Sequence, residues 1–259
     1  MDVGILGGLA IGLAAIAGSV LLDGGDLRAF LNLPAFLIIC GGTVGATMVT
    51  TSLKDTLRLP KLVKMALFPR VSLRPDEVIT TLVDFAQTAR KEGVLALQDR
   101  ASAVGVDPFL VKGIDLVIDG ADETIVREIL QTEIHSMKSR HAKGIEIFGI
   151  MGGYAPTMGI IGTVMGLVHV LSKLGEGTDS LGRGIAIAFL ATFYGIFSAN
   201  VLFLPMSGNL KGKSEEEIQM REVMMEGVLG IQSGLNPHLL EQKLRSYFSS
   251  SGPVKGYGY

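Results

Sequence analysis

Four stretches of mostly apolar residues constrain this chain more than any other feature of its sequence. They cover residues 3–22, 34–53, 145–171 and 182–206. An α-helix rises about 1.5 Å per residue, so about 20 such residues cross the hydrocarbon core of a bilayer. The mean hydropathy of +0.44 and the hydrophobic content of 48% are also high for a soluble protein. The sequence therefore predicts an all-α, four-span polytopic membrane protein.

The basic residues around these stretches predict an orientation. The connections at 23–32 and 172–181 are rich in glycine and poor in positive charge. The other flanks carry Lys54, Arg58, Lys61, Lys64, Arg70, Lys138, Arg140, Lys143, Lys211 and Lys213. Because cytoplasmic loops carry the excess of lysine and arginine, we expect both termini and the 54–144 loop in the cytoplasm. The chain opens without a basic segment, so we expect its first stretch to remain as a span rather than act as a signal peptide.

The long loop has the pattern of a helical domain. The segment "RPDEV" puts Pro75 at a first helical position and two acids in the first turn. Apolar residues follow at helical spacing, in runs that begin at Val78, Leu110 and Ile125. After the fourth stretch, Ser214 and Glu217 predict a capping box at a helix start. Asn236 and Pro237 then predict the opening of a short last helix.

These patterns divide the chain into five parts. The expected parts are a two-span hairpin at 1–53, a cytoplasmic helical domain at 54–144, the third and fourth spans at 145–206, C-terminal cytoplasmic helices at 207–248 and a tail at 249–259. The tail has no apolar period, so we expect it to be disordered.

Small residues recur within the spans at intervals of four. They are Gly4, Gly8, Gly12, Gly41, Gly45, Gly162, Gly166, Ala191, Gly195 and Ala199. This spacing lets membrane helices approach closely, which favours a multi-helical and oligomeric protein. The alternative for any single pair is that glycine is simply common in membrane helices.

Two threonines lie on such small faces. Thr163 shares a face of the third span with Pro156, Gly159 and Gly166, and Thr192 shares one of the fourth span with Ala188, Gly195 and Ala199. We expect both faces to meet other helices rather than lipid. The alternative for each threonine is local, because its hydroxyl can bond back to a carbonyl of the preceding turn.

Two prolines lie inside the predicted spans. Pro156 and Pro205 cannot donate to the carbonyls of Gly152 and Val201, so each should kink its helix or leave a carbonyl in need of a partner. Both lie near the predicted cytoplasmic ends, where a hinge would act. A kink tolerated only for packing is the open alternative.

The interiors of the four predicted spans contain no acidic residue, since Glu146 lies at an edge. A protein that moves ions usually needs an ionisable group within the membrane. If this chain moves ions, a partner must therefore supply the carboxylate. No nucleotide-binding loop, catalytic triad or metal cluster is visible, so we expect neither an enzyme nor a cofactor. The net charge of -2 excludes a nucleic-acid surface, and the single Cys40 excludes an intrachain disulfide.

Several motifs together resemble the MotA/PomA family, the ion-channel subunit of the bacterial flagellar stator. They are "ARKEGVLAL", "VDPFLVKGIDLVIDG", "YAPTMGIIGTVMGLVHVL", "IAIAFLATFYGIFSANVLFLP" and "REVMMEGVLGIQSGLNP". The resemblance runs from Met1 to about Tyr247. It implies an inner-membrane protein, a pentamer of this chain, and a MotB/PomB-like partner whose single membrane helix brings the ion-binding aspartate.

The resemblance also implies roles for residues outside the ion path. Pro156 and Pro205 match the prolines that couple ion passage to cytoplasmic movement. Arg90 matches the loop arginine that meets the rotor protein FliG. The family has an acid eight residues later, where this chain has Gln98. Asp99 or Glu92 would then serve as the acidic contact, and the alternative for Arg90 is an ordinary solvated charge.

Thr163 and Thr192 match the two threonines of sodium-driven members, which implies transported Na⁺, with H⁺ as the alternative. A hydroxyl offers oxygen to a partly dehydrated sodium ion, whereas a proton needs only a carboxylate and water. The nearest rival is a TolQ/ExbB-like energiser of outer-membrane processes, which has three spans and its large loop after the first. A secondary transporter would need its own mid-membrane polar groups and repeat symmetry, which the sequence does not show.

Overall fold

The structure is a computed structural model that describes residues 3–68, 74–101, 106–172 and 178–248. The predicted disordered tail lies outside these residues. The described chain is helical and contains no strand, which confirms the all-α prediction. It forms two compact units, which we call the span unit (1–70 and 141–212) and the helical unit (71–140 and 213–259).

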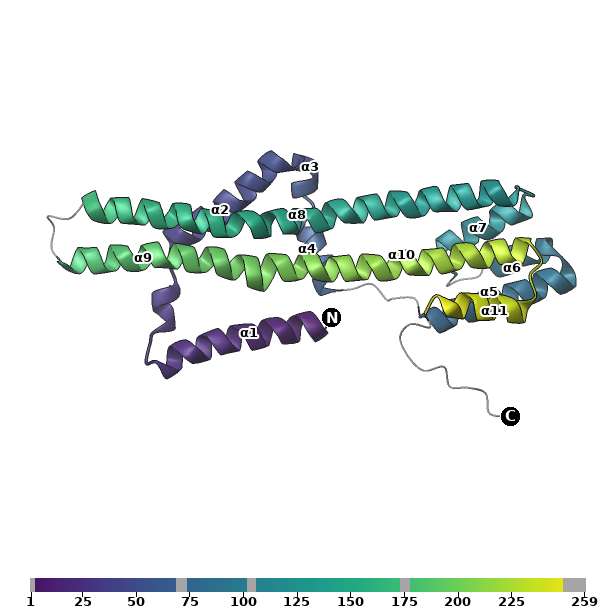
Figure 1. Ribbon diagram of the computed structural model, residues 1–259, viewed down its shortest axis with the longest axis horizontal. Helices are drawn as coiled ribbons and strands as arrows, with labels where there is room; N and C mark the ends of the chain where they lie inside the picture. Colours follow the sequence, from purple (N-terminus) through teal and green to yellow (C-terminus); the bar gives the residue numbers. More distant parts are fainter. Residues whose placement is uncertain (1–2, 69–73, 102–105, 173–177, 249–259) are drawn as a thin grey trace. The chain divides into compact units, whose positions relative to one another are not determined.

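The span unit begins with two helices joined by a short turn; in Figure 1 they lie apart instead of pairing as the predicted hairpin. Helix α1 (Val3–Leu22) coincides with the first predicted span, and the turn η1 (Leu27–Phe30) leads to α2 (Leu33–Thr50). Asn32 caps α2 by accepting a 2.9 Å hydrogen bond from the Ala35 N–H. Helix α2 ends before residue 53 because Ser52 caps the next helix, α3 (Leu53–Thr56), which α4 (Leu59–Leu67) follows.

The third and fourth spans belong to longer helices. Helix α8 (Glu123–Ser172) joins the third span to the preceding amphipathic run without a break. Helix α9 (Thr178–Phe197) continues through the π-helical turn η3 (Ser198–Phe203) into α10 (Leu204–Gln232). Four helices in the described residues are long and apolar enough to cross a membrane, as the sequence predicted.

The predicted helix start at Ser214 is wrong. Ser214 lies inside α10 and is buried, so its hydroxyl does not cap a helix N-terminus. The helix continues because nothing between Pro205 and Ser214 stops it. Gly208 and Gly212 keep helical backbone angles and are not among the glycines with positive φ.

The helical unit packs around a single core. It contains α5 (Pro75–Glu92), the turn η2 (Val94–Ala96), α6 (Leu97–Ala101), α7 (Pro108–Ile118), α11 (Pro237–Ser246) and parts of α8 and α10. Pro75 opens α5 and Asn236 caps α11, as the sequence predicted.

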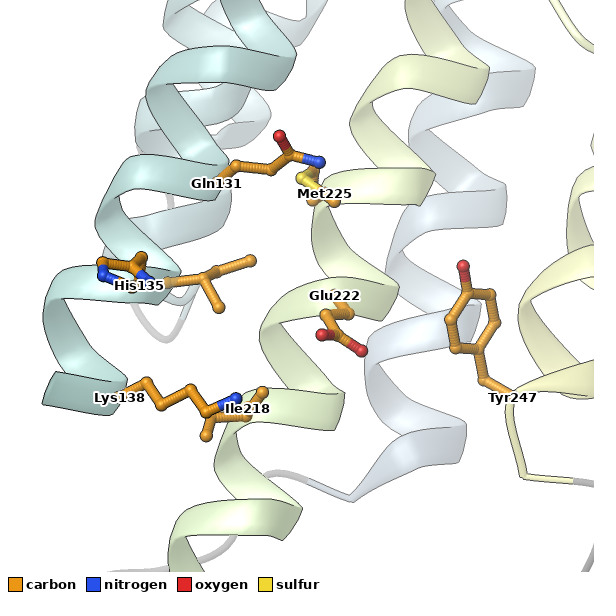
Figure 2. Close-up of a pocket in the computed structure, with 8 residues that line it drawn as sticks. Gln131, His135, Lys138, Ile218, Glu222, Met225 and Tyr247 are labelled. Atoms are coloured by element: carbon orange, nitrogen blue, oxygen red, sulfur yellow. The ribbon is translucent and has the colours of Figure 1, made fainter. Parts of the chain in front are cut away.

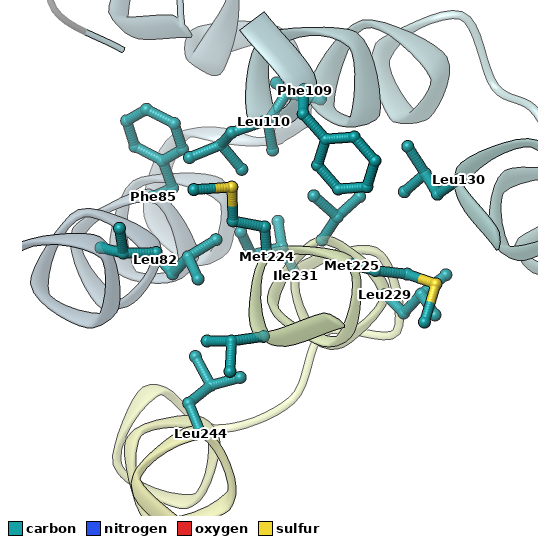
Figure 3. Packing of buried hydrophobic residues seen from close by; sticks show 14 of the residues in the cluster. Leu82, Phe85, Phe109, Leu110, Leu130, Met224, Met225, Leu229, Ile231 and Leu244 are labelled. Carbon is teal, nitrogen blue, oxygen red and sulfur yellow. The ribbon is translucent and has the colours of Figure 1, made fainter. Parts of the chain in front are cut away.

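The core of the helical unit draws one apolar face from each of its longer helices. Figure 3 shows its buried side chains, among them Leu82, Phe109, Leu130, Met224 and Leu244. Burying one such side chain stabilises a fold by about 1.5–3 kcal/mol. This core therefore holds α5, α6 and α7 in fixed positions relative to one another.

Candidate functional site

Helices α8 and α9 approach each other with almost no side chain between them. A Cβ added at Gly159 would lie 3.0 Å from the Ala191 carbonyl oxygen, and one at Gly166 would lie 2.9 Å from the Ala188 Cβ. At Gly195 an added Cβ would come within 2.5 Å of the Ala155 carbonyl oxygen. The small faces predicted for these spans therefore do meet a neighbouring helix.

This approach brings the two predicted threonines together. The Thr163 and Thr192 hydroxyls are directly hydrogen bonded to each other. The Thr163 hydroxyl is also 3.0 Å from the carbonyl oxygen of Gly159 in its own helix and 2.9 Å from that of Ala188 in α9. The local carbonyl partner expected of a threonine in a helix is thus within hydrogen-bond distance, together with two oxygens of the neighbouring helix.

The result is a cluster of four oxygens, two from the threonine hydroxyls and two from the Gly159 and Ala188 carbonyls, with only the two hydroxyl protons among them. Each hydroxyl carries one proton and accepts at two lone pairs. The Thr163 proton can serve only one of its three oxygen neighbours at a time. The cluster therefore has acceptor capacity to spare, which suits a cation or an added hydrogen-bond donor.

Thr192 also borders an apolar groove of about 410 Å³. The other residues of the groove are Ile16, Phe189, Phe193, Ile196, Phe197, Asn200 and Val201. Phe189 is 68% exposed and Ile196 is 50% exposed. The oxygen cluster thus lies beside a surface that an apolar helix could cover.

Helix α2 contributes buried hydroxyls that the sequence analysis missed. Thr43 and Thr47 are almost completely buried. Thr47 donates a 2.7 Å bond to the Thr43 carbonyl oxygen, whereas the Thr43 hydroxyl has no partner among the described residues. Their spacing of four within an apolar run was the available signal, because it puts both on the face that also buries Ala35 and Ile39.

Tyr194 attaches the α1–α2 connection to α9, and this contact was also missed. Its hydroxyl donates to the Phe30 carbonyl oxygen and accepts a 3.0 Å bond from the Asn32 N–H. Phe30 and Phe193 add an edge-to-face contact with their ring centroids 5.5 Å apart. The clamp therefore holds the N-terminus of α2 against the helix that carries Thr192.

The two prolines have different surroundings. Pro156 lies within the continuous helix α8, and its Cα would be 3.2 Å from a Cβ added at Gly195. Pro205 is the second residue of α10 and follows the π-helical turn η3 directly. There the Leu204 N–H bonds to the Ala199 carbonyl, five residues back. A π-turn of this kind is one of the recognised irregularities at which a helix bends.

The four predicted rotor-contact residues lie in consecutive elements of the helical unit. Arg90 and Glu92 are in the last turn of α5, and Gln98 and Asp99 are in α6. All four side chains are exposed. Within the described residues Arg90 makes no ion pair, so its charge is available to a partner.

The arrangement of α5 and α6 is fixed next to these residues. An ion pair of 2.6 Å joins Arg100 of α6 to Asp84 of α5. The intervening Gly93 has a φ of +88°, a left-handed value that favours glycine. The four exposed side chains are therefore carried by a defined corner rather than by a loose loop.

A second group of charges joins three helices of the helical unit. The Glu226 carboxylate accepts hydrogen bonds from Lys243 Nζ at 2.5 Å and from the Arg127 guanidinium at 2.9 Å. Burial by itself would raise the pKa of Glu226, but these two cations outweigh burial and lower it. The group thus links α8, α10 and α11 through a carboxylate that stays ionised.

A cavity of about 270 Å³ lies in the helical unit beside these charges. Figure 2 shows Gln131, His135 and Lys138 of α8 facing Glu222 and Met225 of α10, with Tyr247 beyond them. Burial and the nearby carboxylate of Glu226 raise the pKa of Tyr247, so its hydroxyl stays protonated. The walls carry both signs of charge, so the cavity selects neither an anion nor a cation.

Sequence models of two families match the chain. They are "Motility protein A N-terminal" over residues 6–93 and "MotA/TolQ/ExbB proton channel family" over residues 102–223. Motility protein A of Bacillus subtilis is 37% identical over 98% of this chain and 94% of its own length. Chemotaxis protein PomA of Vibrio alginolyticus is 33% identical over 96% of both chains.

A solved structure agrees with these matches. The structure of the flagellar MotAB stator complex from Bacillus subtilis contains a similar chain, 37% identical over 96% of each chain, with a TM-score of 0.88. The relatives are named as motility and chemotaxis proteins and not as enzymes, as the sequence led us to expect. Matches of this identity over nearly the whole length establish a common family. The chain belongs to the MotA/TolQ/ExbB proton channel family, among its motility protein A members.

Proposed function

We propose that this chain is a stator subunit of the bacterial flagellar motor, located in the inner membrane and not an enzyme. The observation that carries the proposal is the Thr163–Thr192 oxygen cluster between the apolar stretches 145–171 and 182–206, whose interiors contain no acidic residue. A MotB/PomB-like partner with one membrane helix would bring that carboxylate. The similarity to a chain of the MotAB stator complex supports this assignment.

The partner helix would lie beside Thr192, over the apolar groove. An ion on its aspartate would then be next to two hydroxyls and two backbone carbonyls. These oxygens can replace part of the water shell of Na⁺, whereas H⁺ would need only the carboxylate and water. The proposed ion is therefore sodium, with the proton as the alternative.

The charge that crosses would drive movement of the helical unit. Each elementary charge makes available about 2.3 kcal/mol per 100 mV of membrane potential. Pro156 in α8 and Pro205 after the π-turn are the proposed points of flexing. A pentamer of this chain would turn about the partner helices. Arg90, Glu92, Gln98 and Asp99 would then move past charges of the rotor protein FliG.

The membrane orientation in this proposal follows from the basic flanks. Lysines and arginines gather on one side of the spans, which would place both termini and the helical unit in the cytoplasm. A TolQ/ExbB-like role is the alternative within the same family. The two membrane-length helices α1 and α2 before the large loop and the match to the motility protein N-terminal family both favour the flagellar role.

Rotation of tethered cells tests the proposal. A strain without stators would express this chain with its cognate partner while sodium is exchanged for potassium at fixed pH and membrane potential. We expect speed to fall as sodium is withdrawn and to recover when it returns. Thr163→Ala should abolish this response, and Thr163→Ser should retain it because serine keeps the hydroxyl.

Thr157→Ala is the matched control for Thr163. Thr157 also bonds back to a carbonyl of its own helix, that of Tyr154 at 2.8 Å, but its side chain is exposed. We expect this variant to rotate normally. Rotation that follows the proton gradient and ignores sodium would exclude sodium while keeping the stator role. No rotation with any partner or ion would refute the stator role itself.

A further inference from the structure

The segment after α2, comprising α3 and α4, is short and amphipathic. Its inner face is buried: Ala66 is fully buried, and Leu62 packs against α8, where a Cβ added at Gly144 would lie 3.0 Å from the Leu62 side chain. Gly144 immediately precedes the apolar stretch of the third span. Figure 1 shows α4 running at a steep angle to α8 instead of continuing along it. Because the apolar stretch of the third span begins beside α4, we expect α4 to lie along the membrane surface.

The outer face of this region combines exposed apolar side chains with cations. Leu57 is 72% exposed, Phe68 is 48% exposed and Met65 is 36% exposed. Lys61 and Lys64 are exposed between them. Within the described residues neither lysine has an ion-pair partner. Apolar groups of this size beside free cations indicate a surface that something else covers.

The charges around the segment favour an anionic partner. Lys54 on α3 and Lys143 next to Gly144 are also exposed. The positive charge of Arg58 is partly offset by Asp55, because the Asp55 carboxylate lies 3.3 Å from the Arg58 guanidinium. Glu146, one turn further along α8, is the acidic side chain nearest in sequence to Lys143. The cations outnumber these two acids, so the field at the surface is positive.

We propose that the outer face of α3 and α4 binds the headgroups of anionic phospholipids. Leu57, Met65 and Phe68 would enter the boundary between headgroups and acyl chains, and Lys61 and Lys64 would contact the phosphates. The segment is continuous with a spanning helix, so its outer face meets lipid without any movement of the protein. Basic residues with apolar neighbours are the usual composition of surface-lying helices that prefer anionic bilayers.

A tryptophan reporter tests this inference. The chain contains no tryptophan, so Phe68→Trp introduces a single probe on the proposed face. The full chain and its cognate partner, with any partner tryptophan replaced by phenylalanine, would be reconstituted in phosphatidylcholine vesicles. Brominated phosphatidylglycerol or brominated phosphatidylcholine is then titrated in, and quenching reports the lipid in contact with the probe.

Two charge variants in the reporter background separate local contact from net charge. Lys61→Gln with Lys64→Gln removes the proposed phosphate contacts. Lys91→Gln with Lys112→Gln removes the same charge from the helical unit. A basic residue near an anionic surface contributes about 1 kcal/mol, or roughly fivefold in affinity. We expect the first pair to lower the preference for phosphatidylglycerol roughly tenfold or more, and the second pair to leave it unchanged.

The results that would overturn the inference are distinct from each other. Equal quenching by the two lipids before any lysine is changed would mean an apolar contact without headgroup recognition. No quenching by either lipid would mean that a second copy of this chain, or the partner, covers the face. An equal loss in both double variants would mean an effect of net charge only. The readout is independent of ion and rotation, so failure of the proposed function would leave it intact.

Discussion

Gly195 is the position at which the approach of α8 and α9 can be tested most directly. An alanine Cβ there would lie 2.5 Å from the Ala155 carbonyl oxygen, 3.1 Å from the Gly159 Cα and 3.2 Å from the Pro156 Cα. All three atoms belong to the backbone of α8, so no side chain can rotate to make room. Ordinary contacts begin at 3.4 Å, so the two helices would have to separate by about 1 Å.

A separation of this size would also reach the threonine pair. The Thr163 hydroxyl is 2.9 Å from the Ala188 carbonyl oxygen, and adding about 1 Å takes this distance beyond hydrogen-bond range. Overpacking costs about 1–3 kcal/mol, and an interhelical hydrogen bond in a membrane protein contributes about 0.6 kcal/mol. We therefore expect the free energy of unfolding of Gly195→Ala to be about 2–3 kcal/mol lower than that of a glycine-to-alanine change in these helices that causes no clash.

The assay is unfolding of the purified complex by titration with a denaturing detergent, followed by helical circular dichroism. Gly153→Ala is the matched control, since Gly153 lies in α8 and an added Cβ meets nothing within 4 Å. Both changes gain about 1 kcal/mol of helix propensity, so their comparison isolates the clash. Equal stability of the two variants, with sodium-dependent rotation intact in Gly195→Ala, would refute the close approach of α8 and α9.

Three further predictions concern other parts of the chain. Pro156→Ala should leave assembly intact but abolish torque in tethered cells; normal rotation would remove its hinge role. Lys243 and Arg127 lower the pKa of Glu226 in the folded state. The ionised carboxylate therefore stabilises the fold above the unfolded-state pKa of about 4.3, and this stabilisation is lost as the pH falls through the lower folded-state pKa. Lowering the pH from ~5 to ~3 should thus reduce the melting temperature of the wild type more than that of Glu226→Gln. Equal reductions in the two proteins would contradict this. Tyr194→Phe removes both clamp bonds and should destabilise the protein by about 1–2 kcal/mol in the detergent titration. Tyr154→Phe removes only the bond between the Tyr154 and Thr50 hydroxyls and should destabilise it less; equal losses would contradict the clamp.

The features that the sequence predicted are those that depend on local periodicity. Apolar stretches of sufficient length predicted all four spans, and Pro75 and Asn236 predicted two helix starts. The threonine pair was also predictable, because intervals of three and four residues put Thr163 and Thr192 on the small faces of their helices. Close approach of those faces then brings the two hydroxyls together.

The missed features depend on residues far apart in the chain or on the absence of a stop signal. Tyr194 bonds to Phe30, 164 residues away, and no local pattern reports such a pairing. Ser214 and Glu217 have the spacing of a capping box, yet a cap forms only where a helix begins, and α10 is already helical there. The π-turn before Pro205 depends on the backbone bond from Leu204 to Ala199, which composition does not predict.

The glycines between α8 and α9 would shape the proposed ion site as well as the packing of the two helices. Thr163 reaches the Ala188 carbonyl because no side chain separates the two backbones at Gly159, Gly166 and Gly195. A backbone carbonyl is a ligand that mutation of its own residue cannot remove, so the site is sensitive to helix separation rather than to the identity of residue 188. A larger residue at any of these glycines should therefore weaken ion selectivity even with both threonines in place. A proposed site without a charge of its own would thus depend on a few small residues of its two helices.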